Sequence, residues 1–596
     1  MRKNGPYPYY EVKKIRNLKE MLNGACKEFS DRTAFVVKRK GDDKYSEIKY
    51  SQVLKDVNAL GTALIDIGLK DKNIAVIGEN RYEWCISYLA TVNGVGTIVP
   101  LDKELPESEI ESLLERSNAT AIIYSGKKSE QIENIKNRKA TPVKYYITME
   151  DEKESEYNLP NLIERGKKLL KNKDKRYANC KIDEEAAKII LFTSGTTDRS
   201  KAVLLSHKNI VSDMMSACGN ILIVPEDRFF SILPVHHTYE CTTGFLIPLY
   251  RGASIAICEG LRYIAQNMKE TSPTVILGVP AIFEAMYSKL WSTIEKKGLA
   301  KKLNMLLKIS DALLKVGIDI RKKAFKAIHD NFGGKLRLCI VGAAAVNPEV
   351  SVGFRRLGIE FLQGYGLTEC APLIAVNRDH YYNDAAAGVR VRGVDLMIDN
   401  PNDEGVGEIC AKGDNVMIGY YNDPEETKRV LHDGWLHTGD LGYFDKDGFL
   451  FITGRLKSVL ITKNGKNVFP EEIESLLNKS EIIKESMVYQ KENKEKDDTI
   501  ISAILVPDYD KVKEKYGELS EDDLKEKLWQ EVKIVNDNLV SYKHVKEISI
   551  RDKEFEKTTT LKIKRYLVKW WIGLISTFAL ITIEKKCKTC YNKRRK

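Results

Sequence analysis

The chain has 596 residues, of which 43% are hydrophobic and 30% are charged. This length exceeds one ordinary core and predicts two or more domains, and the composition excludes a largely disordered chain. The formal net charge is +11 and looks widely spread, with a basic concentration only at the extreme C-terminus, so we expect no nucleic-acid partner. The 11 cysteines are scattered, and no apolar signal segment stands near Met1, so we expect reduced thiols and a cytoplasmic location.

Short apolar runs alternate with helical patterns over much of the chain. Asn73–Gly78 predicts a buried strand, Tyr82–Val92 a helix, and Gly94–Leu101 the next strand. Similar strands are expected at Thr120–Tyr124, Val143–Ile147, Lys188–Phe192, Ser254–Ile257, Thr274–Leu277 and Leu336–Val341. This alternation predicts an α/β fold with largely parallel sheets.

Three changes of pattern suggest how the chain is divided. Tyr287–Asn331 is rich in Lys and Leu and free of Pro, which predicts a helical insertion. Between Gly388 and Thr453, short strands separated by Gly, Asn and Asp predict a β-rich subdomain. We therefore expect a large N-terminal domain of αβ-layered subdomains plus this β-rich subdomain over residues 1–455, and a small mobile α+β domain over residues 456–565.

Residues 566–596 form an apolar segment followed by a polybasic tail. As a helix, Tyr566–Ile583 would be about 27 Å long at about 1.5 Å per residue, slightly short of a hydrocarbon core of about 30 Å. Two tryptophans at its start and seven Lys or Arg residues after it suit a membrane interface. We expect peripheral membrane contact here, and a helix packed on the protein itself is the alternative.

A hydroxyl-rich loop follows the predicted strand Lys188–Phe192. Thr193–Lys201 (TSGTTDRSK) supplies five hydroxyl groups, one Gly and a Lys, which together can wrap a phosphate. It lacks the spacing of a Walker A loop. Taken alone, it fits a polar surface turn equally well.

Two further segments place nucleotide-binding chemistry close together in the sequence. Gln363–Glu369 (QGYGLTE) follows a strand-like run. Within it Tyr365 can stack on a base, Thr368 can hold a phosphate, and Glu369 can hold Mg²⁺ through oxygen. In Trp435–Gly442 (WLHTGDLG), Asp440 is expected in a turn, where it can accept hydrogen bonds from ribose hydroxyls.

Seven blocks occur together in one order. They are TSGTTDRSK, LPVHHTYE (Leu233–Glu240), VGAAA (Val341–Ala345), QGYGLTE, WLHTGD, GRLKSVLITKNGKNVFPEEIE (Gly454–Glu474) and TTTLKIKR (Thr558–Arg565). With them, the chain resembles the adenylate-forming superfamily over about residues 20–565. Within that superfamily it looks most similar to long-chain fatty acyl-CoA synthetases, because GVPAIFEAMYSKL (Gly278–Leu290) and GKNVFPEEIE (Gly465–Glu474) resemble theirs.

The resemblance implies ATP, Mg²⁺, CoA and a fatty acid as cofactors and substrates, and a role for each matching residue. For the nucleotide these are Thr193, Ser194, Gly195, Thr196, Thr197 and Lys201 in the phosphate loop, Gly342, Ala343 and Ala344 along the adenine, Gln363, Gly364, Tyr365, Gly366 and Thr368 at the adenine and α-phosphate, and Asp440 and Arg455 at the ribose. Lys457 matches the hinge, and Gly465 matches the loop that lines the thiol tunnel. The implied catalytic residues are Lys562, Glu369, Thr193 and His237, and the implied Mg²⁺ ligands are Glu369 and Thr196.

The chain departs from the family pattern at several positions. Asp198 and Ser200 replace the usual Gly and Pro of the phosphate loop, and Ala202 replaces a Gly. Leu561 replaces the Gly before the catalytic lysine, although the spacing favours Lys562 over Lys564. Two alternatives therefore stay open. One is ligation to an acyl carrier protein instead of CoA, and the other is a catalytically decayed relative that only binds an adenylate.

Overall fold

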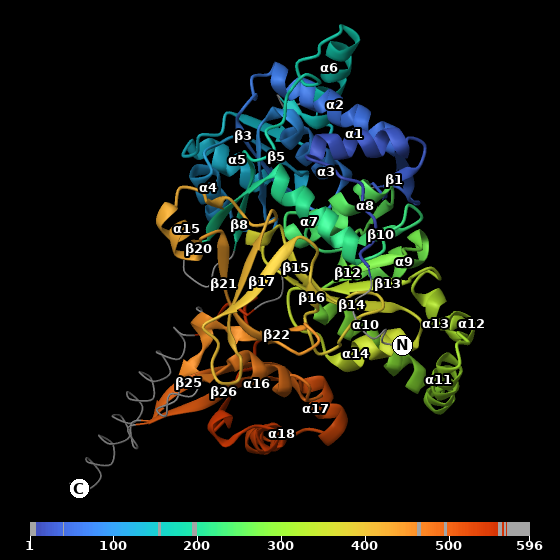
Figure 1. The fold of residues 1–596 in the computed structure, drawn as a ribbon, viewed down its shortest axis with the longest axis vertical. Coiled ribbons are helices and arrows are strands. Elements are labelled where there is room, and N and C mark those ends of the chain that lie inside the picture. The colour runs from blue at the N-terminus through green and yellow to red at the C-terminus, as the bar shows by residue number, and fades with distance from the viewer. Residues whose placement is uncertain are drawn as a thin grey trace, which may run out of the picture. The chain divides into compact units, whose positions relative to one another are not determined.

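The computed structural model describes residues 8–39, 41–152, 157–193, 200–461, 467–493, 498–557, 563–565 and 568. The chain divides into two compact units (Figure 1). The first unit comprises Met1–Phe192 and Ala202–Leu456, and the second comprises Thr193–Lys201 and Lys457–Lys596. Both are mixed α/β, which confirms the predicted fold class.

An eight-stranded sheet forms one layer of the first unit. Its strands, in spatial order, are β19 (Gly419–Tyr420), β9 (Lys201–Ser206), β8 (Ala187–Thr193), β4 (Thr97–Leu101), β3 (Asn73–Ile77), β5 (Ala119–Tyr124), β6 (Tyr145–Thr148) and β7 (Tyr157–Asn158). The pairs from β8 to β7 are parallel, as the continuous apolar runs predicted. The helices that precede or connect these strands in the chain include α2 (Tyr50–Asp66), α3 (Tyr82–Ala90), α4 (Glu107–Arg116), α5 (Ser129–Arg138) and α6 (Leu159–Lys171).

A nine-stranded sheet forms the second layer. Its order is β16 (Val389–Arg390), β15 (Leu373–Val376), β14 (Glu360–Gly366), β13 (Leu338–Val341), β12 (Val275–Gly278), β10 (Arg228–Ser231), β11 (Ser254–Ile257), β1 (Thr33–Val37) and β2 (Ser46–Lys49). Strands β14 to β1 are parallel, and the strands at both edges are antiparallel. Its surrounding helices include α1 (Leu18–Glu28), α7 (His207–Asn220), α8 (Ile247–Arg251), α9 (Ile264–Thr271) and α14 (Pro348–Arg356).

Local sequence signals set where several helices begin. Ser206 caps α7 in a reciprocal capping box with Asn209. Asn158 caps α6, whose first turn also contains a Pro, the residue best tolerated there. Ser206 is also the last residue of β9, so the chain leaves the sheet and enters α7 without a loop.

The predicted β-rich subdomain is an antiparallel sheet in the first unit. It contains β17 (Val394–Asp399), β18 (Gly407–Gly413), β21 (Trp435–Phe444), β20 (Leu431–His432) and β22 (Leu450–Arg455), with α15 (Pro424–Val430) leading into β20. The predicted helical insertion is also present. It contains most of α10 (Pro280–Lys296) and all of α11 (Ala300–Lys315), α12 (Arg321–Ala324) and α13 (Lys326–Asn331).

The second unit is smaller and built around a three-stranded sheet. Its strands are β25 (Ile483–Asn493), β26 (Asp498–Pro507) and β27 (Glu547–Ile550), and a separate pair joins β23 (Leu460–Ile461) to β24 (Asn467–Val468). Its helices are α16 (Pro470–Leu477), α17 (Tyr509–Tyr516) and α18 (Glu521–Asp537). Apolar residues of α16, α18 and the sheet form one buried core, including Ile473, Leu528 and Ala503.

Three local predictions were wrong. The helix from Tyr82 ends its α-helical part at Ala90 and continues as a π-helical turn, η1 (Thr91–Val95), so the next strand begins at Thr97 rather than Gly94. Gln363–Gly366 lie inside β14 rather than after a strand. Asp440 lies within β21 rather than in a turn, because its neighbours pair with both β18 and β22.

The remaining sequence-level expectations concern thiols and the membrane. The nine cysteines that the structure describes are unpaired. Among the described helices, none combines the length and apolarity needed to cross a bilayer. The predicted apolar segment Tyr566–Ile583 lies outside the described residues except for Val568, so peripheral contact through it stays a prediction.

Candidate active site

Two neighbouring parallel strands, β13 and β14, bring the VGAAA and QGYGLTE segments together. Val341 is paired with Gln363 across these strands. The backbone N–H of Val346 donates to Oε1 of Gln363 at 3.4 Å, which connects the loop after β13 to β14. The carboxyl ends of adjacent parallel strands are the usual place for a ligand in an open α/β sheet. The predicted adenine segment, Gly342–Ala344, therefore lies where such a ligand would sit.

The Gly and Ala residues of this loop have distinct steric reasons. A Cβ on Gly342 would lie 3.1 Å from the Tyr239 ring, so a larger residue would displace that ring. The Tyr239 hydroxyl donates to the carbonyl oxygen of Ile340 at 3.0 Å and fixes the ring beside the loop. Ala343 has φ of 72°, a left-handed conformation that is unfavourable for a residue with a Cβ. Such local strain is common at ligand-binding sites.

Residues from three separate motifs meet at the Asp440 carboxylate. The Tyr365 hydroxyl donates to Oδ2 of Asp440 at 2.7 Å, and Nε of Arg455 lies 2.9 Å from Oδ1. Asp440 and Arg455 are directly opposite each other on β21 and β22, so the sheet register sets this ion pair. Asp440 is 6% exposed. Burial and the Asp440 carboxylate raise the pKa of Tyr365 well above its usual range, so the phenol stays a hydrogen-bond donor.

This arrangement adds a contact that the sequence did not predict. Tyr365 was expected to stack on a base, which stays a prediction. The structure shows that its hydroxyl donates to Asp440, the residue predicted to bind the ribose. A carboxylate has about four lone-pair positions. Asp440 can therefore accept further hydrogen bonds from two vicinal hydroxyl groups while it remains held by Tyr365 and Arg455.

Glu369, the predicted Mg²⁺ ligand, is held by a tyrosine from strand β19. Glu369 lies in a short 3-10 helix, η5 (Thr368–Cys370), and its Oε1 accepts a hydrogen bond from the Tyr420 hydroxyl at 2.9 Å. The N–H of Met417 donates to the Glu369 carbonyl at 2.8 Å. Burial, and next the Glu369 carboxylate, raise the pKa of Tyr420 and keep it protonated. A half-buried carboxylate held through one oxygen fits the all-oxygen coordination that Mg²⁺ prefers.

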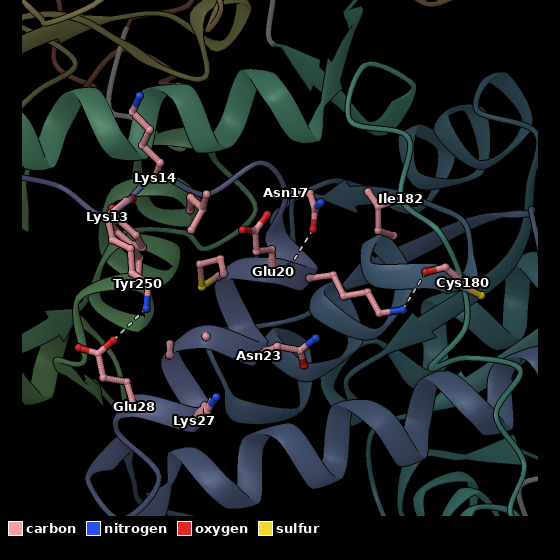
Figure 2. Close-up of a pocket in the computed structure, with 15 residues that line it drawn as sticks. Lys13, Lys14, Asn17, Glu20, Asn23, Lys27, Glu28, Cys180, Ile182 and Tyr250 are labelled. Carbon is pink, nitrogen blue, oxygen red and sulfur yellow. Dashed lines mark hydrogen bonds and ion pairs between the residues drawn. The ribbon is translucent and has the colours of Figure 1, made fainter.

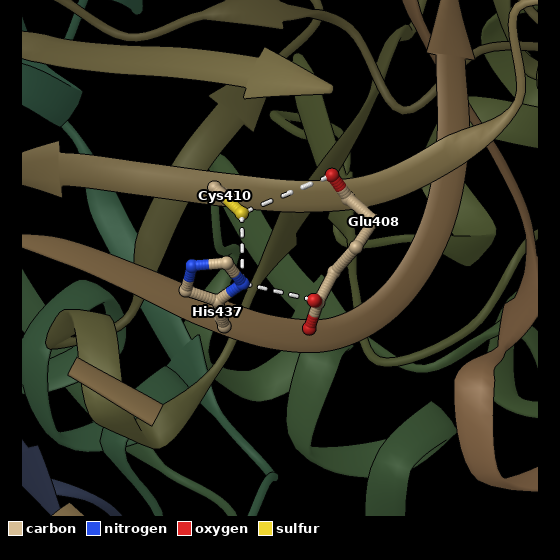
Figure 3. Close-up of side chains that lie close together, drawn as sticks. All are labelled: Glu408, Cys410 and His437. Carbon is tan, nitrogen blue, oxygen red and sulfur yellow. Dashed lines mark hydrogen bonds and ion pairs between the residues drawn. The ribbon is translucent and has the colours of Figure 1, made fainter. Parts of the chain in front are cut away.

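A second donor cluster lies on one face of β18 and β21 (Figure 3). Nδ1 of His437 lies 2.9 Å from Oε2 of Glu408 and 3.4 Å from Sγ of Cys410. All three donor atoms lie within 4.8 Å of one another. This mixed set suits a borderline cation such as Zn²⁺ rather than Mg²⁺. Oε1 of Glu408 also accepts the N–H of Gly439 at 2.8 Å, so the cluster fixes the backbone next to Asp440.

The LPVHHTYE segment enters a π-helix, η3 (Tyr239–Leu246). His237 is half-buried, and its Nδ1 accepts the N–H of Tyr239 at 3.2 Å, so a neutral ring carries its proton on Nε2. Glu240 is fully buried. The Ser231 hydroxyl donates to its Oε1 at 2.6 Å, and its Oε2 has no hydrogen-bond partner among the described residues. Burial raises the pKa of Glu240 to about 8.

The predicted phosphate loop is described only at its two ends. Thr193 ends β8 and Lys201 begins β9, and the Thr193 hydroxyl donates to the Lys201 carbonyl at 3.5 Å. Ser194, Gly195, Thr196 and Thr197 lie outside the described residues, as do Gly465 and Lys562. Lys457 is described as an exposed residue of the 3-10 helix η6 (Leu456–Ser458).

Several residues of this site were not found from the sequence. Nothing in the sequence predicted that Tyr420 would bond to Glu369, that Glu408 would bond to the N–H of Gly439 beside Asp440, or that Glu240 would be buried beside Ser231. Glu240 does stand in a quoted motif, three residues after His237, and an acidic residue before a long apolar run was the one available signal.

A hollow of about 560 Å³ lies around α1, away from this chemistry (Figure 2). Its lining includes none of the predicted site residues. Two of its lysines already bond within the protein, since Lys13 pairs with Glu28 at 3.1 Å and Lys19 donates to the Cys180 carbonyl at 2.9 Å. We assign no ligand to it.

Comparison with known proteins identifies the family. The model for the AMP-binding enzyme family matches residues 22–421, and the model for the AMP-binding enzyme C-terminal domain matches residues 457–569. The chain belongs to the AMP-binding enzyme family. It is therefore an adenylate-forming acid–thiol ligase, as the ordered motifs predicted.

Similar proteins include two mammalian ligases. The chain is 30% identical to human long-chain-fatty-acid–CoA ligase 1, with 83% of this chain and 73% of the human protein covered. It is also 30% identical to rat long-chain-fatty-acid–CoA ligase 5, with 93% and 86% covered.

Solved structures share the fold at lower identity. The anthranilate CoA ligase AuaEII in complex with anthranoyl-AMP has a TM-score of 0.75 at 19% identity, covering 96% of this chain and 99% of that one. A Mycobacterium tuberculosis fatty acyl CoA synthetase has a TM-score of 0.61 at 22% identity, covering 93% and 97%.

Proposed function

We propose that this AMP-binding enzyme activates a long-chain fatty acid with ATP and transfers the acyl group to CoA, releasing AMP and pyrophosphate. The observation that carries the nucleotide part is that Tyr365 and Arg455 both bond to the buried carboxylate of Asp440, although the three residues come from separate motifs. The choice of a long-chain fatty acid and of CoA as substrates is supported by relatives that are 30% identical over most of the chain, which are long-chain-fatty-acid–CoA ligases. For the protein's location, we propose the cytoplasm.

In the first step, a carboxylate oxygen of the acid attacks the α-phosphorus of ATP and pyrophosphate leaves. Gly342, Ala343 and Ala344 line the adenine, with Gln363, Gly364 and Gly366 shaping the same wall. Gly366 must be a Gly, because a Cβ there would lie 2.0 Å from the Pro372 carbonyl. Asp440 accepts the ribose hydroxyls while Tyr365 and Arg455 fix its position.

Charge builds on the phosphate oxygens in this transition state, and preorganised donors and cations stabilise it. Thr193, Lys201 and the loop between them, together with Thr368 and Lys562, supply these donors in our proposal. Glu369, fixed by Tyr420, and Thr196 would hold Mg²⁺, which would neutralise phosphate charge. His237 lies beside the carboxylate of the acid.

In the second step, the CoA thiolate attacks the acyl-adenylate and AMP leaves. We propose that the small domain rotates about Lys457 between the steps, withdrawing Lys562 and bringing the Gly465 loop to the thiol. Domain movements of this kind commonly bring different catalytic groups to a site at different steps of a reaction.

The division of labour can be tested with Lys562→Ala and the matched control Lys564→Ala. Lys562→Ala should lower the rate of acid-dependent pyrophosphate exchange at least about hundredfold, the size expected when a preorganised charge contact is removed. Thioester formation from supplied acyl-adenylate should stay near the wild-type rate. Equal loss of both half-reactions, or a larger loss from Lys564→Ala, would contradict this assignment.

A further inference from the structure

The positive charge of the chain is concentrated rather than spread, which corrects the expectation from composition. The helical insertion, residues 287–331, contains eleven Lys and Arg residues against four Asp and Glu residues, an excess of +7. Residues 566–596 also carry +7, and the other 520 residues together carry −3. The insertion is therefore a basic element on an otherwise slightly acidic folded body.

The insertion also carries an apolar stripe that faces solvent. On α11, Met305 is 58% exposed and Ile309 is 45% exposed, while Val316, which caps the helix, is 72% exposed. With the exposed Ala312 these residues are spaced by four, three and four, so they fall on one face of a helix with about 3.6 residues per turn.

The opposite face of α11 is already used by the protein core. Leu303 and Leu307 are buried, and they pack in a cluster with Phe325 of the insertion and Leu357 after α14. The exposed stripe is therefore not part of the face with which α11 packs on the core. It is a second apolar face, about half a turn away from the first.

Four lysines flank this stripe. Lys301, Lys302, Lys308 and Lys315 are all exposed, and within the described part of the chain none of them forms an ion pair. The one acidic residue of α11, Asp311, is already paired with Arg356 at 2.6 Å. The face thus combines exposed apolar side chains with uncompensated positive charge, and α11 lies at the margin of the first unit (Figure 1).

We propose that this face of α11 docks on an anionic lipid surface. An apolar stripe flanked by lysines is the pattern of a helix that lies in a membrane interface, where the lysine stems contact acyl chains and the ammonium groups reach the headgroups. A protein partner would need its own acidic, apolar groove, whereas a leaflet of anionic lipid supplies both properties at any point. The proposal does not depend on residues 566–596 or on the identity of the acid.

Lysine footprinting on the full chain tests this directly. An amine-reactive acetylating reagent is applied with and without vesicles, and modification of each lysine is read by mass spectrometry. On vesicles that contain phosphatidylserine, Lys301 and Lys308 should be modified several-fold more slowly, while Lys168 and Lys171 of α6 serve as internal controls in the same unit. Vesicles of phosphatidylcholine alone should protect much less, because each lysine near an anionic surface contributes about 1 kcal/mol, about fivefold in affinity.

A matched pair of variants separates the face from the rest of the protein. Met305→Gln, Ile309→Gln and Val316→Gln combined should lower vesicle partitioning at least about tenfold, since about one transferred side chain is worth that factor. The control Ile534→Gln with Val540→Gln changes residues of similar exposure, 58% and 52%, in the second unit and should leave partitioning unchanged. Solution activity should be unchanged in both variants.

Three results would overturn the proposal. The first is equal modification of the α11 and α6 lysines on anionic vesicles. The second is unchanged partitioning of the triple variant. The third is protection that rises with protein concentration in the absence of vesicles, which would assign the face to a second copy of this chain.

Discussion

Replacing Glu240 by Gln should remove a pH dependence from the stability of the protein. Glu240 is fully buried beside Ser231, and burial raises its pKa to about 8, against a usual value of 4.5. A carboxyl whose pKa is raised on folding stabilises the folded state fully below the unfolded pKa. That contribution is lost as pH rises from the unfolded value of 4.5 to the folded value of about 8, because in this interval the folded protein holds a proton that the unfolded chain has released.

The size of the effect follows from these two values. Between pH 6 and pH 8 the cost of keeping Glu240 buried rises by about 2 kcal/mol, since one pKa unit corresponds to about 1.4 kcal/mol. Gln has nearly the same shape, can accept the Ser231 hydrogen bond, and does not titrate. The free energy of unfolding of Glu240→Gln relative to wild type should therefore rise by about 2 kcal/mol over this interval.

Urea denaturation at pH 6, 7 and 8 measures this difference, and the exposed Glu115→Gln serves as a matched control that should run parallel to wild type. Circular dichroism and tryptophan fluorescence should report the same shift. A constant difference between Glu240→Gln and wild type across this range would refute the reasoning, because it would mean that Glu240 titrates alike in the folded and unfolded states.

Two further substitutions test the nucleotide site. Tyr365→Phe keeps the ring but removes the 2.7 Å hydrogen bond to Asp440. The KM for ATP should therefore rise about tenfold, the equivalent of about 1.4 kcal/mol. The control is Tyr381→Phe, which loses a hydrogen bond to the Asp447 carbonyl and should leave the KM for ATP unchanged. A KM for ATP that stays unchanged in Tyr365→Phe would contradict the proposal that Tyr365 positions Asp440 for ATP binding. Tyr420→Phe removes the 2.9 Å hydrogen bond to Glu369. The Mg²⁺ concentration for half-maximal activity should rise about tenfold, as is typical when a group that orients a metal ligand is lost. An unchanged Mg²⁺ titration would contradict the role given to Glu369.

Much of the fold could be predicted because its strands are buried on both faces. Runs such as Asn73–Ile77 and Ser254–Ile257 are continuous apolar stretches, and their bounds agree with the prediction to within a residue. The errors lie where tertiary pairing overrides local chemistry. Gly439 has φ of 70° and looks like a turn residue in the sequence, yet β18 and β22 pair on both sides of β21 and keep Asp440 in a strand.

The candidate site was predicted motif by motif, but its internal bonds were not. Ordered motifs identified Tyr365, Asp440 and Arg455 separately, and only the folded structure shows that they bond to one another. Tyr420 could not be found, because it lies 51 residues after Glu369 and reaches it through the pairing of β19 with β9. The concentration of charge in the insertion was readable from the sequence, but the apolar stripe opposite the α11 core became visible only once burial was known.

A chain-length panel of acids with ATP and CoA tests the central claim most directly. AMP release is followed for palmitate and oleate against acetate and benzoate, in parallel with pyrophosphate exchange without CoA. The proposed function predicts the highest kcat/KM for the long-chain acids, with exchange that depends on the acid and thioester that appears only when CoA is added. Exchange that is absent with every acid, or a clear preference for acetate or benzoate, would contradict it.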